Sequence, residues 1–244
     1  MPDKFTQRSC QAELLDAPNI PKKLLFQNLR ELDFINKTLG GHSITLSGIK
    51  KLLTDKSKTY HIIDIGCGGG DAMKHIADWA RANHYKVKLT GVDMNADAVD
   101  YLNSNCNDYL EITGVVSDYR DYLKSSYHTD IVHCSLFCHH LKDDELTELF
   151  SYMKQYAKIG FVINDLQRHW LAYYSIKVLT RLFNGSSLVK NDAPLSVLRG
   201  FKKPELVHLF EKGKVENVTI NWKWAFRYLV VGKKLKEFTS PFTN

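Results

Sequence analysis

Three histidines and two cysteines lie within the eight residues HCSLFCHH, from His133 to His140. All five are side chains that can bind zinc, but structural zinc sites usually take them in closely spaced pairs. The sequence contains no CxxC pair, and the remaining cysteines, Cys10, Cys67 and Cys106, lie far apart with no histidine tract beside them. This spacing argues against a metal site, and we expect none.

The same stretch follows Asp130 with apolar and β-branched residues, a pattern typical of a buried strand. In such a strand Cys134 and Cys138 fill space as small apolar groups. The chemistry of the two histidines that follow, His139 and His140, then depends on what the rest of the chain brings to the end of this strand.

Composition narrows the class of protein. The chain has 244 residues, 44% of them hydrophobic and 25% charged, which suits one globular domain, alone or with a small cap. The net charge of +6 comes with lysines scattered in pairs, as on a solvated surface, so we expect no nucleic-acid partner. No stretch approaches the ~20 apolar residues of a membrane span, and the start lacks a signal-peptide core. Together with five unpatterned cysteines, this predicts a cytoplasmic protein without a membrane span.

From Tyr60 onward, predicted strands and helices alternate along the chain. We expect strands at 60–66, 86–93, 111–116, 130–137 and 158–164, and helices at 71–83, 95–105 and 143–158. Such alternation makes a parallel sheet with helices on both faces. Asn95 stands where it can cap the second helix.

The C-terminal part breaks the alternation, because the predicted strands at 214–224 and 226–234 follow one another almost directly and would pair antiparallel. The fold class is therefore α/β: a doubly wound, Rossmann-like, seven-stranded sheet with an antiparallel C-terminal edge strand. Residues 1–58 show helical periodicity and no strand pattern, which predicts an N-terminal helical cap over the ligand-binding edge. Residues 59–244 then form the main domain, with a lid region at about 166–205.

The glycine-rich turn in IIDIGCGGGD indicates which cofactor this sheet takes. A dinucleotide fingerprint needs GxGxxG, but the sixth position counted from Gly66 is Asp71, whose carboxylate would repel a pyrophosphate at the helix start. NAD is therefore disfavoured. Asp93, at the end of the next strand, can accept both hydroxyls of a ribose. The pattern predicts a nucleoside cofactor without a pyrophosphate.

From roughly Lys58 to Lys234, the chain resembles the class I S-adenosylmethionine-dependent methyltransferases. The resemblance rests on IIDIGCGGGD, GVDMN, VVSDYRDY, DIVHCSLF followed by HHL, and FRYLVVGKK, all in the family's order. It implies S-adenosylmethionine as the cofactor. The residues that would hold the methionine part are Asp64, Gly66, Cys67, Gly68 and Gly70.

The resemblance also implies contacts for the rest of the cofactor. Asp93 would bind the ribose hydroxyls and Met94 would cover the adenine face. Asp118, next to Tyr119, would meet the adenine amino group. Cys134 and Ser135 look like backbone contacts to the cofactor's amino group, although Cys67 and Met94 are equally compatible with simple packing.

The segments HHLKDDEL, FVINDLQRHW and LSVLRGFKKPEL resemble the ubiquinone/menaquinone-biosynthesis-like methyltransferases of small molecules. This resemblance implies a small-molecule acceptor, and some such relatives modify the hydroxyl of phenolic or polyketide-like compounds. The departure of HCSLFCHH from the pattern of the quinone enzymes leaves the acceptor open. Methylation of nitrogen or carbon stays an alternative, as does a non-catalytic partner protein. A nucleic-acid methyltransferase is disfavoured by the lack of a basic groove or an NPPY tetrad. The sequence leaves the oligomeric state open.

Candidate catalytic residues follow from an acceptor hydroxyl. A sulfonium methyl is already activated, so the enzyme mainly aligns donor and acceptor, and a neutral histidine can remove the proton of a phenol. The histidines that can do this are His139, His140 and His169, and Asp165 could orient His169 or act as the base itself. Packing or capping roles remain open for each of them.

For the acceptor we expect the segment after Asp165. Trp170, Tyr173 and Tyr174 lie on neighbouring helical turns and could form an aromatic wall, or part of the core. Arg168 is a further binding candidate, unless it only pairs with Asp165. The polar stretch from Asn184 to Arg199 is interpreted as an exposed, mobile lid.

Overall fold

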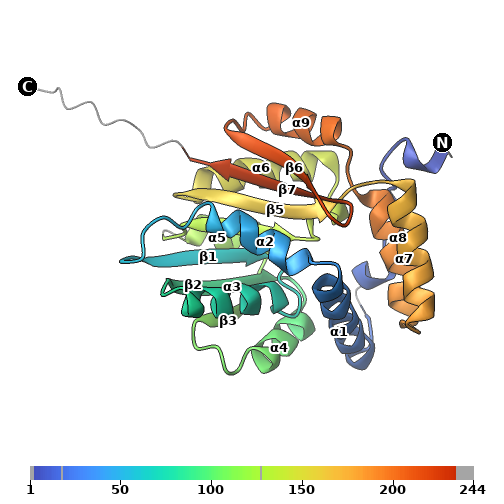
Figure 1. Cartoon of the computed structure of the whole chain (residues 1–244), viewed down its shortest axis with the longest axis horizontal. Helices are drawn as coiled ribbons and strands as arrows, with labels where there is room; N and C mark the ends of the chain where they lie inside the picture. Colours follow the sequence, from blue (N-terminus) through green and yellow to red (C-terminus); the bar gives the residue numbers. More distant parts are fainter. Residues whose placement is uncertain (1–2, 18, 127, 235–244) are drawn as a thin grey trace, which may run out of the picture.

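Seven strands form one mixed sheet in the order β3-β2-β1-β4-β5-β7-β6, which confirms the predicted fold class (Figure 1). The computed structural model describes residues 3–17, 19–126 and 128–234. The strands are β1 (Thr59–Ile65), β2 (Lys86–Asp93), β3 (Ile112–Val116), β4 (Ile131–Ser135), β5 (Gly160–Leu166), β6 (Val218–Lys223) and β7 (Arg227–Lys233). β1 to β5 pair parallel, whereas β7 pairs antiparallel with both β5 and β6. The antiparallel strand thus lies one place in from the edge, and β6 forms the edge itself.

Helices cover both faces of the sheet, as the strand–helix alternation predicts. The helices are α1 (Lys22–Thr38), α2 (Gly41–Lys50), α3 (Asp71–Ala82), α4 (Ala96–Asn105), α5 (Tyr119–Ser125), α6 (Asp143–Tyr156), α7 (Trp170–Leu182), α8 (Ser187–Arg199) and α9 (Lys203–Lys212). Three short 3₁₀ turns are η1 (Asp3–Phe5), η2 (Leu14–Asp16) and η3 (Cys138–His140). Asn95 caps α4 as expected, because its side chain accepts hydrogen bonds from the amides of Asp97 and Ala98.

Neighbouring residues of β1 show why both faces are covered. Ile62 packs into the core cluster that contains residues of α2, α3 and α4, whereas Ile63 and Ile65 pack into the cluster with α5, α6 and α9. Successive side chains of a strand point to opposite faces, so an apolar run in β1 requires a helix layer on each side. This sandwich fixes the carboxyl ends of the parallel strands at one edge.

Three helices gather beyond that edge. Figure 1 shows α1 near the ends of the strands and the pair α7 and α8 standing side by side next to it, and contacts join α1 to α8. Of the two helices in the segment predicted as an N-terminal cap, α1 lies beyond this edge, whereas α2 packs on the sheet through contacts with β5 and β7. Among the described residues, no helix combines the length and the apolar character that crossing a membrane requires.

The prediction of an exposed loop from Asn184 to Arg199 is wrong. After Ser186, whose hydroxyl accepts a hydrogen bond from the Val189 amide, the chain forms α8. Seven side chains of α8 are buried, among them Leu188, Leu195 and the polar Asp192. The polar residues that suggested a loop serve as a cap and as internal hydrogen-bonding partners, so composition alone misjudged the segment.

The predicted strand 130–137 is shorter than expected. β4 ends at Ser135, and Leu136 adopts a positive φ of 55°, which turns the chain into η3. HCSLFCHH is therefore split: His133 and Cys134 lie in the buried strand, whereas His139 and His140 lie in a turn beyond it.

Candidate functional site

A cavity of about 700 Å³ lies where the parallel strands end. Its walls come from the turn after β1, the residues after β2, β3 and β4, and the helices α1, α7 and α8. In open α/β sheets ligands bind in this position, outside the carboxyl ends of the strands.

The glycine turn contributes backbone to the cavity wall. Gly66, Cys67 and Gly68 line the cavity, and the two glycines have positive φ values of 64° and 49°. A Cβ on Gly66 would overlap the ring of Phe137, so the turn tolerates no side chain there. Gly70 is different: it begins α3 against Leu102 and Cys106 and is not among the cavity-lining residues, so its predicted cofactor contact is replaced by a packing role.

Two carboxylates near the strand ends line the cavity, Asp64 buried and Asp93 partly buried. Burial, and then the neighbouring charge of Asp93, raises the pKa of Asp64 well above its usual value. Asp93 accepts hydrogen bonds from the amides of Gly68 (3.1 Å) and Asn95 (2.9 Å), and burial nevertheless raises its pKa. Each Asp93 oxygen accepts one of these two amides, and a carboxylate oxygen can accept a further hydrogen bond. Met94 also lines the cavity, with an exposed side chain at its rim.

Besides Gly70, two more predicted cofactor residues lie outside the cavity. Asp118 caps α5, accepting from the Arg120 amide and pairing with the Arg120 guanidinium at 3.0 Å, while its neighbours Ser117 and Tyr119 line the cavity. The Tyr119 hydroxyl is buried without a hydrogen-bond partner. Cys134 is fully buried, with its sulfur 3.5 Å from that of Cys138, whereas Ser135 lines the cavity as predicted.

His139 and Asp165 form a buried pair at the cavity. His139 Nδ1 lies 2.7 Å from Asp165 Oδ1, and the His139 amide also donates to Asp165. Burial alone would raise the pKa of Asp165, but the charge of His139 and its hydrogen bond lower it overall. The expectation that Asp165 orients His169 is therefore wrong: strand β5 brings it to η3 instead. With Nδ1 bound to a carboxylate, His139 turns Nε2 toward Glu13, and both residues line the cavity.

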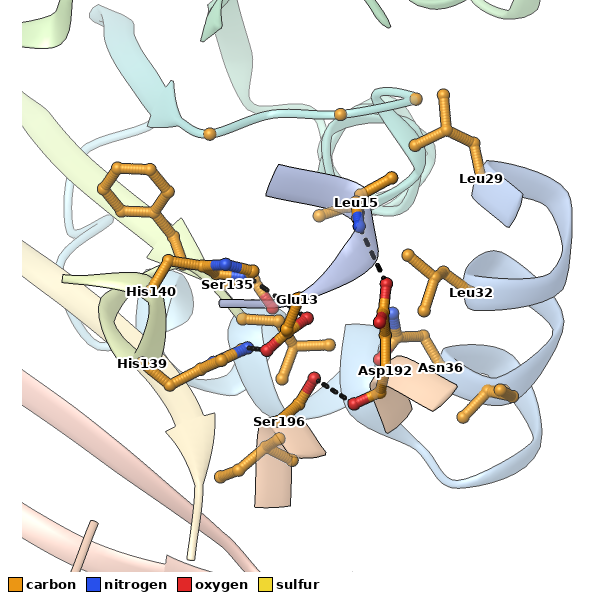
Figure 2. Close-up of a pocket in the computed structure, with 18 of the residues that line it drawn as sticks. Glu13, Leu15, Leu29, Leu32, Asn36, Ser135, His139, His140, Asp192 and Ser196 are labelled. Carbon is orange, nitrogen blue, oxygen red and sulfur yellow. Dashed lines mark hydrogen bonds and ion pairs between the residues drawn. The ribbon is translucent and has the colours of Figure 1, made fainter. Parts of the chain in front are cut away.

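His140 lies beside His139, and both meet an acidic segment from the start of the chain. His140 Nδ1 is 2.9 Å from Asp16 Oδ1. Burial lowers the pKa of His140, but the Asp16 hydrogen bond and the charges of Glu13 and Asp16 outweigh it, so the pKa is raised. Figure 2 shows Glu13 reaching toward His139; its Oε1 is 3.7 Å from His139 Nε2 and its Oε2 4.0 Å from His140 Nε2. Glu13 and Asp16 are functional candidates that sequence reasoning missed, because no spacing links them to residue 139.

His169 is not part of this cluster. It caps α7, where its Nδ1 accepts a hydrogen bond from the Leu171 amide, and its ring stacks on Phe226 at 5.0 Å. It is also absent from the cavity lining. The prediction of His169 as a catalytic base is replaced by a structural role at the helix start.

The aromatic side chains predicted to form a wall of the binding site do not face the cavity. α7 turns Ala172, Ser175, Ile176 and Leu179 toward the cavity, at the i, i+3, i+4 and i+7 spacing of one helix face. Trp170, Tyr173 and Tyr174 occupy other faces; Tyr173 and Tyr174 pack against Phe5.

Arg168 likewise serves the fold. Its buried guanidinium donates to the carbonyls of Phe5 and Gly200 and pairs with Glu205, so it lies away from the cavity and is not bound to Asp165.

A second arginine, which the sequence did not single out, does line the cavity. Arg227 is 2% exposed, and one nitrogen donates to Asn36 Oδ1 at 2.8 Å. Its Nε and Nη1 atoms have no hydrogen-bond partner. Burial lowers the pKa of Arg227 to about 10. A buried guanidinium with unused donors is a ready partner for an acceptor oxygen or carboxylate.

Comparison with known proteins agrees with this geometry. Residues 62–160 match the family described as a methyltransferase domain. The chain is 28% identical over 145 residues to the ubiquinone biosynthesis O-methyltransferase of Coxiella burnetii, a match that covers 58% of each chain. The chain thus spans 58% of the length of the curated relatives that it matches.

Solved structures share the fold at low sequence identity. The plantazolicin methyltransferase in complex with SAH is 17% identical, with a TM-score of 0.60 over 82% of this chain and 78% of its own. Human N-acetylserotonin methyltransferase in complex with SAM is 14% identical, with a TM-score of 0.60 over 88% of this chain and 56% of its own. At these identities the likeness establishes the fold.

Proposed function

We propose that the chain, whose residues 62–160 match a methyltransferase domain, is a class I S-adenosylmethionine-dependent methyltransferase that transfers a methyl group to a hydroxyl of a phenolic or polyketide-like small molecule. The observation that carries the hydroxyl assignment is the pair of His139 and Asp165, which places a histidine Nε2 at the cavity wall. The C. burnetii relative is an O-methyltransferase by name, which supports the same class of acceptor.

The cofactor would lie along the carboxyl ends of β1, β2 and β4. Gly66, Cys67 and Gly68 bring backbone close to its methionine part, with Asp64 and the Ser135 segment on either side. Asp93 takes the ribose hydroxyls with the acceptor capacity that its two amide bonds leave unused. With Asp118 capping α5, the adenine is held instead between Met94 and the residues Ser117 and Tyr119.

The acceptor would lie between this turn and the apolar faces of α1 and α7. S-adenosylmethionine supplies a methyl group already activated on a sulfonium, so alignment provides most of the rate enhancement. Asp165 holds the proton of His139 on Nδ1, which leaves the lone pair of Nε2 to accept the hydroxyl proton as the oxygen attacks. Arg227 and Asn36, which also line the cavity, orient a polar group of the acceptor.

The proposal is tested with the full chain and methyl-labelled S-adenosylmethionine. Incubation with a panel of phenols, anilines and carbon acids is followed by mass spectrometry of the products. Labelled methyl ethers from the phenols, and none from phenols already methylated on oxygen, are expected. Label found only in amine or carbon products would overturn the hydroxyl assignment.

Cofactor choice is tested separately by thermal shift. A ligand that binds the native state raises the unfolding midpoint, so S-adenosylhomocysteine should raise it at concentrations where NAD does not. A larger shift with NAD would contradict the assigned cofactor.

A further inference from the structure

We propose that Glu13, His139 and His140 form a binding site for one divalent transition-metal ion, with Zn²⁺ as the best match. Each residue offers one ligand atom, and the three atoms lie within 4.8 Å of one another. The site was not expected from the sequence, because its carboxylate lies more than a hundred residues from the histidines. The inference concerns cation binding by this chain alone and does not depend on the proposed methyl transfer.

The distances suit a metal after a small contraction. Two donors bound to one zinc at tetrahedral angles lie about 3.4 Å apart, given metal–donor bonds of about 2.1 Å. The Glu13 oxygens lie 3.7 Å and 4.0 Å from His139 Nε2 and His140 Nε2. The two distances from Glu13 therefore have to shorten by about 0.3–0.6 Å, and the three ligand atoms start within 4.8 Å of one another.

The outer partners of the histidines already have the arrangement of a metal site. Metal-binding histidines usually donate their other ring N–H to a carboxylate or carbonyl, which fixes the ring and its tautomer. His139 Nδ1 is bound to Asp165 at 2.7 Å and His140 Nδ1 to Asp16 at 2.9 Å. Both rings are thereby held with Nε2 toward Glu13, as Figure 2 shows for the labelled residues.

Glu13 supplies the independent observation that points to a ligand. It is 5% exposed, and its Oε1 is a buried oxygen without a hydrogen-bond partner. A buried carboxylate oxygen with no donor is costly, and a cation would satisfy it. The segment that carries Glu13 is held in place, because Asp192 of α8 accepts hydrogen bonds from the amides of Leu14 and Leu15 at 2.9 Å.

Local charge favours a cation despite a nearby arginine. Arg199 Nε lies 3.7 Å from Glu13 Oε1, but it donates to the His139 carbonyl, and the other guanidinium nitrogens bind the carbonyls of Gln11 and His140 and the Asp16 carboxylate. These bonds hold Arg199 beside the cluster and out of its centre. Glu13, Asp16 and Asp165 together outweigh its single positive charge.

The ligand set selects the metal. Two imidazoles and one carboxylate suit zinc and its neighbours, whereas magnesium and calcium prefer oxygen ligands. Three protein ligands leave a coordination position open, and all three residues line the cavity. A metal on His139 Nε2 and a proton accepted by the same atom exclude each other, so the proposed base role applies to the metal-free chain.

The test uses the untagged full chain, stripped with chelator and exchanged into metal-free buffer. Calorimetric titration with Zn²⁺, and with Co²⁺ followed by visible absorption, should give one ion per chain. Glu13→Gln keeps the shape of the side chain and should weaken binding by more than the roughly 10–100-fold that loss of an outer partner costs. Asp16→Asn, which alters such an outer partner, should fall within that roughly 10–100-fold range. His140→Asn, at a partly exposed position, provides a second ligand variant if Glu13→Gln fails to fold.

The matched control is the double variant His208→Ala and Glu211→Gln, which removes the same two ligand types from the exposed face of α9. It should bind zinc as the unaltered chain does. Equal zinc affinity for the unaltered chain and Glu13→Gln, or loss of binding in the control, would overturn the proposal. S-adenosylhomocysteine affinity is measured on the same metal-free samples, so a failure of the metal site is distinguished from a failure of the proposed function.

Discussion

At the scale of single residues, the structure gives different roles to two carboxylates for which the sequence predicted the same role. Asp93 ends β2 and Asp118 follows β3, and both were predicted as cofactor contacts. The structure leaves Asp93 facing the cavity with spare acceptor capacity, whereas Asp118 caps α5 and pairs with Arg120. The two residues are therefore expected to respond differently to the same substitution.

Asp93→Ala should weaken S-adenosylhomocysteine binding by about 1.5–3 kcal/mol, the range for hydrogen bonds to a charged group. Isothermal titration calorimetry measures this directly. Asp118→Ala is the matched control: it should lower stability by about 0.5–2 kcal/mol, as loss of a helix cap does, and leave cofactor affinity nearly unchanged. Similar affinity losses in both variants would refute the separation.

The same comparison applies to the histidines. His139→Ala should lower turnover about 10²–10⁴-fold, the usual contribution of a general base, while cofactor affinity stays nearly constant. His169→Ala removes a capping group outside the cavity and should leave the turnover of the folded protein within a few-fold. Turnover and unfolding midpoints measured on both variants decide the matter: normal turnover in His139→Ala would remove this residue from the mechanism.

At the scale of elements, α8 is the part that the sequence misrepresented and on which the site depends. Its Asp192 is 5% exposed and binds the amides of Leu14 and Leu15, so the helix fixes the segment that carries Glu13 and Asp16. A helix that looked like a mobile lid thus positions the acidic half of the cluster.

Asp192→Ala should lower the free energy of unfolding by about 1–3 kcal/mol, because two amides lose their partner. Urea denaturation measures the loss. Lys190→Ala, at an exposed position of the same helix, should change it by less than about 0.5 kcal/mol. If Asp192→Ala is as stable as the Lys190 variant, the contact between α8 and the N-terminal segment contributes nothing in solution.

At the scale of the whole molecule, the sheet holds a buried acid at the cost of stability. Burial raises the pKa of Asp64 well above 3.8. For a group whose folded pKa is raised, the associated stability is fully present below the unfolded pKa and is lost as pH rises through the folded pKa. Asp64 therefore makes the folded protein progressively less stable above about pH 4, the pKa range of an unperturbed aspartate.

Asp64→Asn removes this ionisation, so its stability relative to the unaltered chain should increase steadily as pH rises from 4 toward neutrality. Denaturant titrations at several pH values test the trend. The same variant should bind S-adenosylhomocysteine more weakly, as expected where a strained site serves function. A stability difference that does not change with pH would show that Asp64 ionises as freely in the folded state as in the unfolded chain.

The sequence by itself determined the sheet and its cofactor edge. Periodicity located the seven strands and the helices α3, α4 and α6, because an apolar run such as that of β1 must be covered on both faces. The glycines after β1 and Asp93 at the end of β2 could also be predicted from the sequence, because Gly66 and Asp93 act together with the backbone next to them. Such local requirements leave a pattern in neighbouring residues.

Only the tertiary structure decided which side chains share the cavity. Glu13, His139 and Arg227 come from distant segments, and no spacing rule connects them. Helix rotation decided the rest: four small or aliphatic side chains of α7 face the cavity, while Trp170 and Tyr174 do not. Along a helix, successive residues are rotated by about 100°, so neighbouring positions of similar composition face different directions. The cluster of Glu13, His139 and His140 arises from packing between distant segments.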